Sequence, residues 1–282
     1  MRDRKCFEIS EDKDACSRSG SPATPVQQTP TARSPDASKA PSDKVLLRHF
    51  GEAVLFQAQE HLSSQFRQKH GDEGSHWRTH PYGGSSFGTS VFTHERFRGK
   101  RDEMTPDRGT HSLGYSDSVF KIFWIDCPSD PEHRGARDLR DGFDKETGVL
   151  SVAARSYSMN PEENPVVTLK DSGTFFVNSE KGPQEVGWIE MERVLEPEDL
   201  NENEVRGLVN DLHDKLRYTH NDIQYTNIMR RKDGRLVLID LEKATPITDT
   251  QKTMDHGAAL EAVKAERLTP SFLQRLVLAG DD

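Results

Sequence analysis

The sequence predicts an α+β fold, because its apolar residues follow the helix period in some segments and form strand-like runs in others. One apolar residue recurs at every fourth position between about 44 and 69, which makes a single stripe along a helix: Leu46, Phe50, Val54, Ala58, Leu62 and Phe66. The runs at 118–124 and 185–194 have the composition of strands. With 282 residues, the chain can bury a core in one or two domains.

The first 43 residues are predicted to be a disordered tail. Their stretch SGSPATPVQQTPTARSPDASKAPSD is rich in Pro, Ser, Thr and Ala and nearly free of large apolar side chains. Such a segment cannot bury enough surface to offset its ordering entropy. The folded domain is therefore expected over 44–282.

Charge and cysteine usage exclude several classes of protein. The net charge of −9 disfavours nucleic-acid binding, because that affinity comes largely from cationic contacts to phosphates. Cys6, Cys16 and Cys127 show no metal or disulfide spacing, which fits a reducing compartment. No apolar run approaches transmembrane length, and the N-terminus lacks the apolar core of a signal peptide. We expect an intracellular protein, cytoplasmic or nuclear, that is not secreted and does not span a membrane.

The middle of the chain is predicted to alternate strands and helices. Residues 75–118 are rich in Gly, Ser, His and Arg and show no clear period. After them we expect, in order, a strand over 118–124, a helix over 143–156, two short strands over 165–177 and a strand over 185–194. The two short strands are separated at Asp171-Ser172-Gly173, which has the composition of a turn.

The C-terminal third begins with a long predicted helix over about 202–217. Asn201 and Glu204 form a plausible capping pair at its start. Its apolar residues share one face: Val205, Leu208, Val209, Leu212 and Leu216. A last helix is expected to begin near Thr269, with Pro270 at its first position, and to end at Gly280.

Three oxygen-bearing side chains surround a predicted hairpin. The turn Asp233-Gly234 joins NIMRR to RLVLID, so that Asn227 stands at the start of one strand and Asp240 leaves its partner. Because a hairpin folds back on itself, Asn227 and Asp240 are expected to lie close together. Their oxygens suit Mg²⁺, a hard cation that shares phosphate oxygens. Asp222, nearby but not bound to the metal, is suited to accept a proton from an attacking hydroxyl.

These residues resemble those of the protein-kinase-like superfamily. HNDIQYTN, from His220 to Asn227, resembles its H-x-D-x-x-x-x-N catalytic loop, and LIDLE resembles the metal-binding motif that follows. The Asp-to-Asn step of five residues and the Asp-to-Asp step of 18 match that superfamily. The variants HND and IDLE are closer to aminoglycoside phosphotransferases and choline kinases, and to divergent kinase-like proteins common in fungi. The resemblance implies that Asp222 is the catalytic base, that His220 is structural, and that Asn227 and Asp240 bind magnesium.

The resemblance extends upstream to a lysine and its partner. Lys121 in VFKIF matches the strand lysine that holds the α and β phosphates of ATP, where a fixed ammonium neutralises phosphate charge. Glu146 is the candidate for the helix glutamate that pairs with Lys121. A carboxylate on an exposed helix face is the alternative for Glu146, and a solvent-facing strand lysine is the alternative for Lys121.

The adenine and phosphate contacts are predicted less specifically. GWIEMERV resembles the strand and hinge that receive adenine, with Ile189 at the gatekeeper position and backbone contacts from Glu190, Met191 and Glu192. An ordinary core strand would have a similar sequence. Two stretches are candidates for a glycine-rich phosphate loop, YGGSSFGTSVF and GTHSLGYSDSVFK, with a plain flexible loop as the alternative for both.

The chain also departs from the superfamily's pattern. Asn221 replaces the arginine of HRD, so that control by a phosphorylated activation loop is not expected. Gln224 stands where many protein kinases carry lysine, and Glu242 stands where DFG has glycine. Only 42 residues follow Asp240, so that the C-lobe is expected to be small. The sequence therefore does not predict the acceptor.

Together these features predict a bilobal protein-kinase-like α+β fold, with a small antiparallel-sheet N-lobe over about 75–190 and a reduced helical C-lobe over about 195–282. The expected function is transfer of the γ-phosphate of MgATP to a hydroxyl of a protein Ser/Thr or a small-molecule alcohol. ATP and Mg²⁺ are the expected cofactors. A catalytically inactive pseudokinase, acting as a binding or scaffold module, is the alternative. A helical interaction module built on 44–69 is a third reading, which explains none of the hairpin residues.

Overall fold

The structure is a computed structural model that describes residues 43–71, 76–82, 88–97, 113–127 and 138–266. All of these residues belong to one compact unit, Pro41–Asp282. The predicted tail over 1–43, apart from its last residue, and the helix expected after Thr269 lie outside the described residues.

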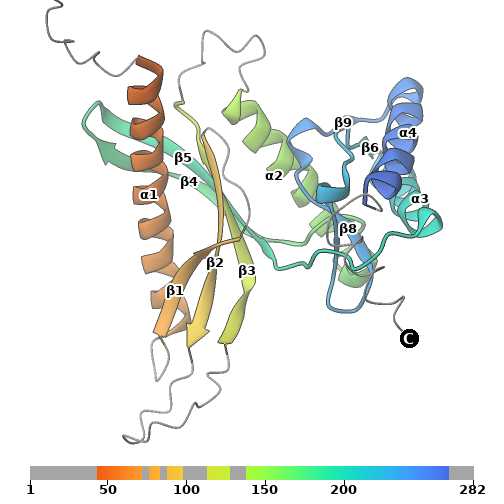
Figure 1. Ribbon diagram of the computed structural model, residues 1–282, viewed down its shortest axis with the longest axis horizontal. Helices are drawn as coiled ribbons and strands as arrows, with labels where there is room; N and C mark the ends of the chain where they lie inside the picture. Colours follow the sequence, from red (N-terminus) through yellow and green to blue (C-terminus); the bar gives the residue numbers. More distant parts are fainter. Residues whose placement is uncertain (1–42, 72–75, 83–87, 98–112, 128–137, 267–282) are drawn as a thin grey trace, which may run out of the picture. The chain divides into compact units, whose positions relative to one another are not determined.

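A five-stranded antiparallel sheet, β1-β2-β3-β5-β4, forms the first half of the fold (Figure 1). Its strands are β1 (His76–Pro81), β2 (Thr89–Phe97), β3 (Leu113–Trp124), β4 (Leu169–Ser179) and β5 (Gly182–Glu192). The central strand β3 pairs Lys121 with Val91 on one side and with Ile189 on the other. The predicted strands at 118–124 and 185–194 are therefore confirmed, with shifted ends. The strands β1 and β2 and the first half of β3 fall in the region that showed no clear period.

The expectation of two short strands over 165–177 is wrong, because β4 runs through Asp171-Ser172-Gly173 without a turn. Gly173 pairs with Trp188 of β5, and a Cβ atom on Gly173 would lie 3.1 Å from the Trp188 indole nitrogen. The glycine makes room for an indole ring within the sheet. The pairing of β4 with β5 shifts its register between Leu169 and Asp171, as at a β-bulge.

Helix α1 (Asp43–His70) covers one face of the sheet with the predicted apolar stripe (Figure 1). Its residues Val54, Ala58, Leu62 and Phe66 are all buried, in a cluster with side chains of β2 and β3. A Cβ atom on Gly51 would lie 2.8 Å from the Trp124 ring, so that this glycine permits the close approach of the helix.

Helix α2 (Leu139–Ser156) packs against the opposite face. Asp138 caps the helix by accepting a hydrogen bond from the Asp141 amide (3.0 Å), which starts it four residues before the expected 143–156. Along β3, Phe120, Ile122 and Trp124 belong to the α1 cluster, and Phe123 belongs to the α2 cluster. The strand period of two therefore places Lys121 on the α2 face.

The second half of the fold is built from short elements and two helices. In chain order after a 3-10 turn at Pro161–Glu163, they are α3 (Glu202–Asp211), the π-helical turn η2 (Leu212–Leu216), β6 (Tyr218–Thr219), η3 (Tyr225–Asn227), β7 (Ile228–Arg230), β8 (Leu236–Leu238), η4 (Leu241–Lys243), β9 (Thr245–Pro246) and α4 (Asp249–Glu266). The apolar face predicted for 202–217 is buried throughout: Val205, Leu208, Val209, Leu212 and Leu216.

The helix predicted over 202–217 differs from the structure in two details. The α-helix ends at Asp211, and the chain continues as a π-helical turn through Leu216. Asn201 caps the helix as expected, with its side chain accepting from the Asn203 amide (2.8 Å), whereas the Glu204 carboxylate lies 3.4 Å from Arg230 and does not complete a capping box.

The predicted α+β fold class is confirmed: an antiparallel-sheet lobe is followed by a small helical lobe. Helix α4 was not predicted from the sequence. No helix within the described ranges is both long and apolar enough to cross a membrane.

Candidate active site

The hairpin at the centre of the site forms as predicted. Strands β7 and β8 pair Ile228 with Leu238 around the turn at Asp233-Gly234, where Gly234 has a φ of +89°. The Ile239 amide donates to the Asn227 carbonyl (3.0 Å). The hairpin thus brings Asn227 beside the segment that ends in Asp240.

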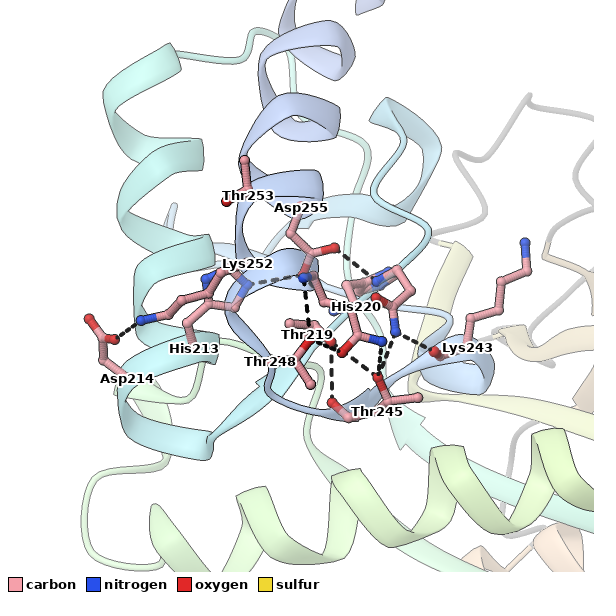
Figure 2. Close-up of polar contacts among 12 residues, drawn as sticks. His213, Asp214, Thr219, His220, Lys243, Thr245, Thr248, Lys252, Thr253 and Asp255 are labelled. Carbon is pink, nitrogen blue, oxygen red and sulfur yellow. Dashed lines mark hydrogen bonds and ion pairs between the residues drawn. The ribbon is translucent and has the colours of Figure 1, made fainter. Parts of the chain in front are cut away.

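A buried carboxylate on α4 fixes the backbone of the loop at His220 (Figure 2). Asp255 is 1% exposed, and its side chain accepts hydrogen bonds from the amides of His220 (2.7 Å) and Asn221 (2.9 Å). His213, also buried, contacts the same carboxylate at 3.0 Å. Burial alone would raise the pKa of Asp255, but the hydrogen bonds from His213 and the two amides outweigh it, so that the pKa lies below its ordinary value.

Two side chains of the loop tie it to the segment after Asp240. The His220 ring bonds to the Ile239 carbonyl through Nε2 (2.9 Å), which agrees with a structural role. The Asn221 amide group donates to the Lys243 carbonyl and to the Thr245 hydroxyl, both at 2.9 Å. Asn221 adopts a left-handed backbone conformation with a φ of 62°, which asparagine tolerates better than most residues.

Both oxygens of the Asp222 carboxylate have partners in this loop. Oδ2 lies 2.8 Å from the Lys243 ammonium, and Oδ1 accepts from the Gln224 side chain at 3.0 Å. The Asn227 Nδ2 atom donates to the Asp222 carbonyl (2.9 Å), and Asn227 is 8% exposed. Since its nitrogen serves the loop, the Asn227 oxygen is the atom suited to a metal.

Lys121 lies at the centre of three carboxylates. Its ammonium is 2.8 Å from Glu146, 2.6 Å from Asp240 and 2.8 Å from Glu242. The lysine, Glu146 and Glu242 are buried, and the Asp240 side chain is 35% exposed. The structure therefore brings together a strand lysine, a helix glutamate and the aspartate that follows the hairpin, as the resemblance implied.

Glu242 is the residue that sequence reasoning did not assign to the site. Its near neighbours in sequence, Leu241 and Ala244, are both apolar and buried, and Glu242 is buried with them. A buried glutamate needs a partner, so this apolar context was the sequence signal for a site residue. Its other neighbour is Gly142 of α2, where a Cβ atom would lie 3.1 Å from Glu242 Oε2. A side chain at Gly142 would press on this carboxylate.

The cluster gathers three carboxylates around one cation. The Lys121 ammonium faces the carboxylates of Glu146, Asp240 and Glu242. These carboxylates offer oxygens within 4.8 Å of one another. An all-oxygen donor set fits Mg²⁺.

The residues predicted to contact adenine lie in the ladder of the central sheet. Glu190 pairs with Phe120 and Asp171, and Met191 pairs with Val119 and Leu169.

Their neighbour Glu192 donates its amide to the Thr168 carbonyl (3.0 Å). The side chain of Glu190 bonds to Ser118 (2.6 Å), and that of Glu192 bonds to Thr168 (2.8 Å). The structure therefore does not bring the Glu190 and Glu192 side chains into the Lys121 cluster, whereas Ile189 lies opposite Lys121 on β3.

The chain leaves the sheet just after these residues, and it is contacted there from β1. The hydroxyl of Tyr82, which follows β1, donates to the Val194 carbonyl, and the Arg193 guanidinium lies 5.8 Å from the Tyr82 ring centroid.

The sheet order also locates the first candidate for the glycine-rich loop. Residues 82–88, which include YGGSSFG, connect β1 to β2, and β2 is the neighbour of β3. Gly88 has a φ of +82°, and its carbonyl accepts from the Trp124 amide (2.8 Å). Of this loop, 83–87 lie outside the described residues. The second candidate is divided: Gly109 also lies outside them, and Gly114 pairs with Arg96 within the sheet.

Comparison with known proteins gives fold-level similarity alone. No family model matches the chain, and no curated protein matches it. Among solved structures, a high-resolution (2.2 Å) crystal structure of WbdD aligns with a TM-score of 0.34 at 16% identity over 61% of this chain and 33% of that chain. Monomeric WbdD gives 0.36 at 16% over 73% and 45%, and WbdD with the kinase inhibitor LY294002 gives 0.34 at 15% over 57% and 33%.

The chain thus spans less than half the length of these WbdD chains. TM-scores below 0.5 do not assign a family to it. The functional argument depends on the site alone.

Proposed function

We propose that this chain is an ATP-dependent phosphotransferase, which moves the γ-phosphate of MgATP to a hydroxyl group of a protein or a small-molecule alcohol. The observation that carries the proposal is the cluster in which one lysine faces three carboxylates. It lies beside a loop that presents a further aspartate, Asp222, next to a second lysine. Phosphoryl transfer needs both parts: cationic neutralisation of the nucleotide and an oriented nucleophile.

In this proposal the carboxylates of Asp240 and Glu242 and the amide oxygen of Asn227 hold Mg²⁺. When bound, the ion would neutralise charge on the nucleotide phosphates. Lys121 binds the phosphates, and Glu146, buried on α2, holds the ammonium at 2.8 Å. The β1–β2 connection is proposed as the phosphate loop.

Asp222 is proposed as the catalytic base. Its carboxylate is 21% exposed, so that a hydroxyl can reach it, and the loop backbone below it is fixed by Asp255. For the adenine contacts we propose the end of β5 and the residues that follow it, Glu192 to Val194, because this segment resembles the hinge that receives adenine. The buried Ile189 would border the base.

The test uses the full chain with radiolabelled [γ-³²P]ATP and Mg²⁺, and measures both label release to water and label transfer to pooled protein and alcohol acceptors. Asp222→Asn should lower the turnover number about 100-fold or more, while MgATP binding is kept, because the base acts on the acceptor rather than on the nucleotide. Asp214→Asn, an exposed carboxylate paired with Lys252, is the matched control and should keep turnover.

Two results contradict the proposal in different ways. A wild-type chain that binds MgATP but never turns it over would favour the inactive binding module. Equal turnover in wild type and Asp222→Asn would remove Asp222 from the chemistry.

A further inference from the structure

A second lysine stands at the reacting end of the site, and the proposed roles leave it unused. The Lys243 ammonium lies 2.8 Å from Asp222 Oδ2. The lysine side chain is 59% exposed, so that a substrate can reach its ammonium. Isolated ion pairs at exposed positions contribute little to stability, which makes a purely structural purpose for this pair weak.

The backbone of Lys243 is held more firmly than an exposed surface residue requires. Its carbonyl accepts from the Asn221 side chain (2.9 Å), and the same amide group bonds to Thr245 (2.9 Å). On either side, η4 ends at Lys243, and β9 pairs Thr245 with Thr219. Figure 2 shows the Lys243 side chain extending away from the Asp255 network that fixes the loop. The ammonium is therefore presented from a tethered segment.

The loop around Asp222 supplies no cation of its own. Gln224, two residues after the base, contacts the other carboxylate oxygen with a neutral amide (3.0 Å). Within the part of the chain that the structure describes, Lys243 is thus the cation that contacts Asp222, and it comes from the segment after Asp240 instead of the loop.

We propose that Lys243 is a catalytic residue, whose ammonium bridges Asp222 and the phosphoryl group in transfer. The inference rests on the phosphotransferase function proposed above. In the step, the acceptor oxygen forms a bond to the γ-phosphorus, and the bond from that phosphorus to the β,γ-bridging oxygen breaks with its electron pair leaving on ADP. The acceptor proton moves to Asp222. Lys243 keeps its protons and donates hydrogen bonds to an equatorial oxygen, where charge stabilisation lowers the barrier.

The decisive experiment relocates the charge within the loop. Lys243→Ala should lower the turnover number about 100-fold, with the KM for ATP changed by less than about threefold, because the ammonium acts on the transition state. Adding Gln224→Lys to it should restore turnover at least about tenfold, since position 224 reaches the same carboxylate. Lys243→Met keeps a long unbranched side chain without the charge and should behave like Lys243→Ala.

Lys264→Ala, which removes a comparably exposed lysine paired with Glu261, is the matched control and should equal wild type. Wild-type turnover in both Lys243 variants would overturn the inference and leave the phosphotransferase intact. Loss of the MgATP thermal shift in Lys243→Ala would overturn it too, because the lysine would then be a binding residue. Absence of turnover in wild type and in the Lys264 control would instead remove the proposed function, and the inference with it.

Discussion

At the residue scale, Asp240 and Glu242 flank the buried Leu241, and both carboxylates contact the same lysine. Leu241 between them is buried in the core, so that Asp240 and Glu242 leave the turn together and meet the ammonium of Lys121. Asp240 itself adopts a left-handed conformation with a φ of 61°, which an aspartate tolerates better than a branched residue. The local backbone is thus shaped to aim both carboxylates at one lysine.

The proximity of three carboxylates to one another predicts an unusual response to Glu242→Gln. Without Mg²⁺ the variant should keep or raise the free energy of unfolding, by up to about 1 kcal/mol, because one of several repelling carboxylates becomes neutral while Lys121 keeps two partners. Its stabilisation by millimolar Mg²⁺ should be lost, since a ligand is gone. Urea denaturation with and without Mg²⁺ measures both effects, with Glu261→Gln as the exposed control. A marked loss of stability without Mg²⁺ would contradict the expected repulsion among the carboxylates.

At the element scale, α4 supports the loop that carries Asp222. Asp255 accepts from two consecutive loop amides and contacts His213 in the π-helical turn η2, so that one carboxylate joins α4, the loop and η2. Thr248 precedes α4, and its hydroxyl accepts from the Gln251 amide (3.3 Å). Nothing in the sequence distinguishes Asp255 from the other acidic residues near the C-terminal end.

Removing that carboxylate should harm stability and turnover together. Asp255→Asn keeps one acceptor oxygen but turns an amide donor toward groups that already donate, and a buried unsatisfied contact of this kind costs about 3 kcal/mol. We expect turnover to fall about tenfold or more even where the variant is folded, because the loop that carries Asp222 loses its position. Thermal unfolding and single-turnover assays at low temperature measure the two effects. A folded variant with full turnover would contradict the supporting role.

At the scale of the whole molecule, α1 packs on the face of the sheet opposite α2 and buries His94 of β2 there. His94 is 1% exposed and stacks on Phe66 of α1, with ring centroids 4.3 Å apart. Burial, and to a smaller extent Arg67 and His70, lowers the pKa of His94 to about 4. The folded protein therefore keeps this ring neutral at a pH where the unfolded chain binds a proton.

This difference predicts an acid-dependent loss of stability. Because the folded pKa lies below the unfolded value of about 6.5, the contribution is fully present above that pH and is lost progressively as the pH falls toward 4, up to about 3 kcal/mol. Asp255, whose pKa is also lowered, would lose its contribution only below its ordinary value near 4. Urea unfolding of His94→Phe between pH 7 and 4.5 should show a shallower loss than wild type. Equal slopes would place the acid sensitivity elsewhere.

Several elements could be predicted from the sequence because one local signal decided them. The stripe of α1, the turn at Asp233-Gly234 and the spacing from Asp222 to Asp240 each follow from residues close together in the chain. The pairing of Lys121 with Glu146 came from a resemblance. Glu242 and Asp255 were not assigned roles because their partners are distant in sequence.

Other features depend on the sheet as a whole. The order of the strands was needed to see that the glycines after Tyr82 precede β2, since the 33-residue separation of that loop from Lys121 includes all of β2. Gly173 suggested a turn from composition, and only the packing of Trp188 shows why a glycine stands there. Residue propensity and motif spacing do not reveal such contacts between strands.

One measurement decides whether the Lys121 cluster is a nucleotide–metal site: a thermal-unfolding titration of the full chain with ATP, with and without Mg²⁺, on wild type and Asp240→Asn. Ligand at about 100 times its dissociation constant stabilises the folded state by about 3 kcal/mol, which raises the midpoint by roughly 5–10 °C for a domain of this size. We expect that rise in wild type with Mg²⁺ present, and its loss in Asp240→Asn. No rise in wild type, or an equal rise in both proteins, would contradict the assignment.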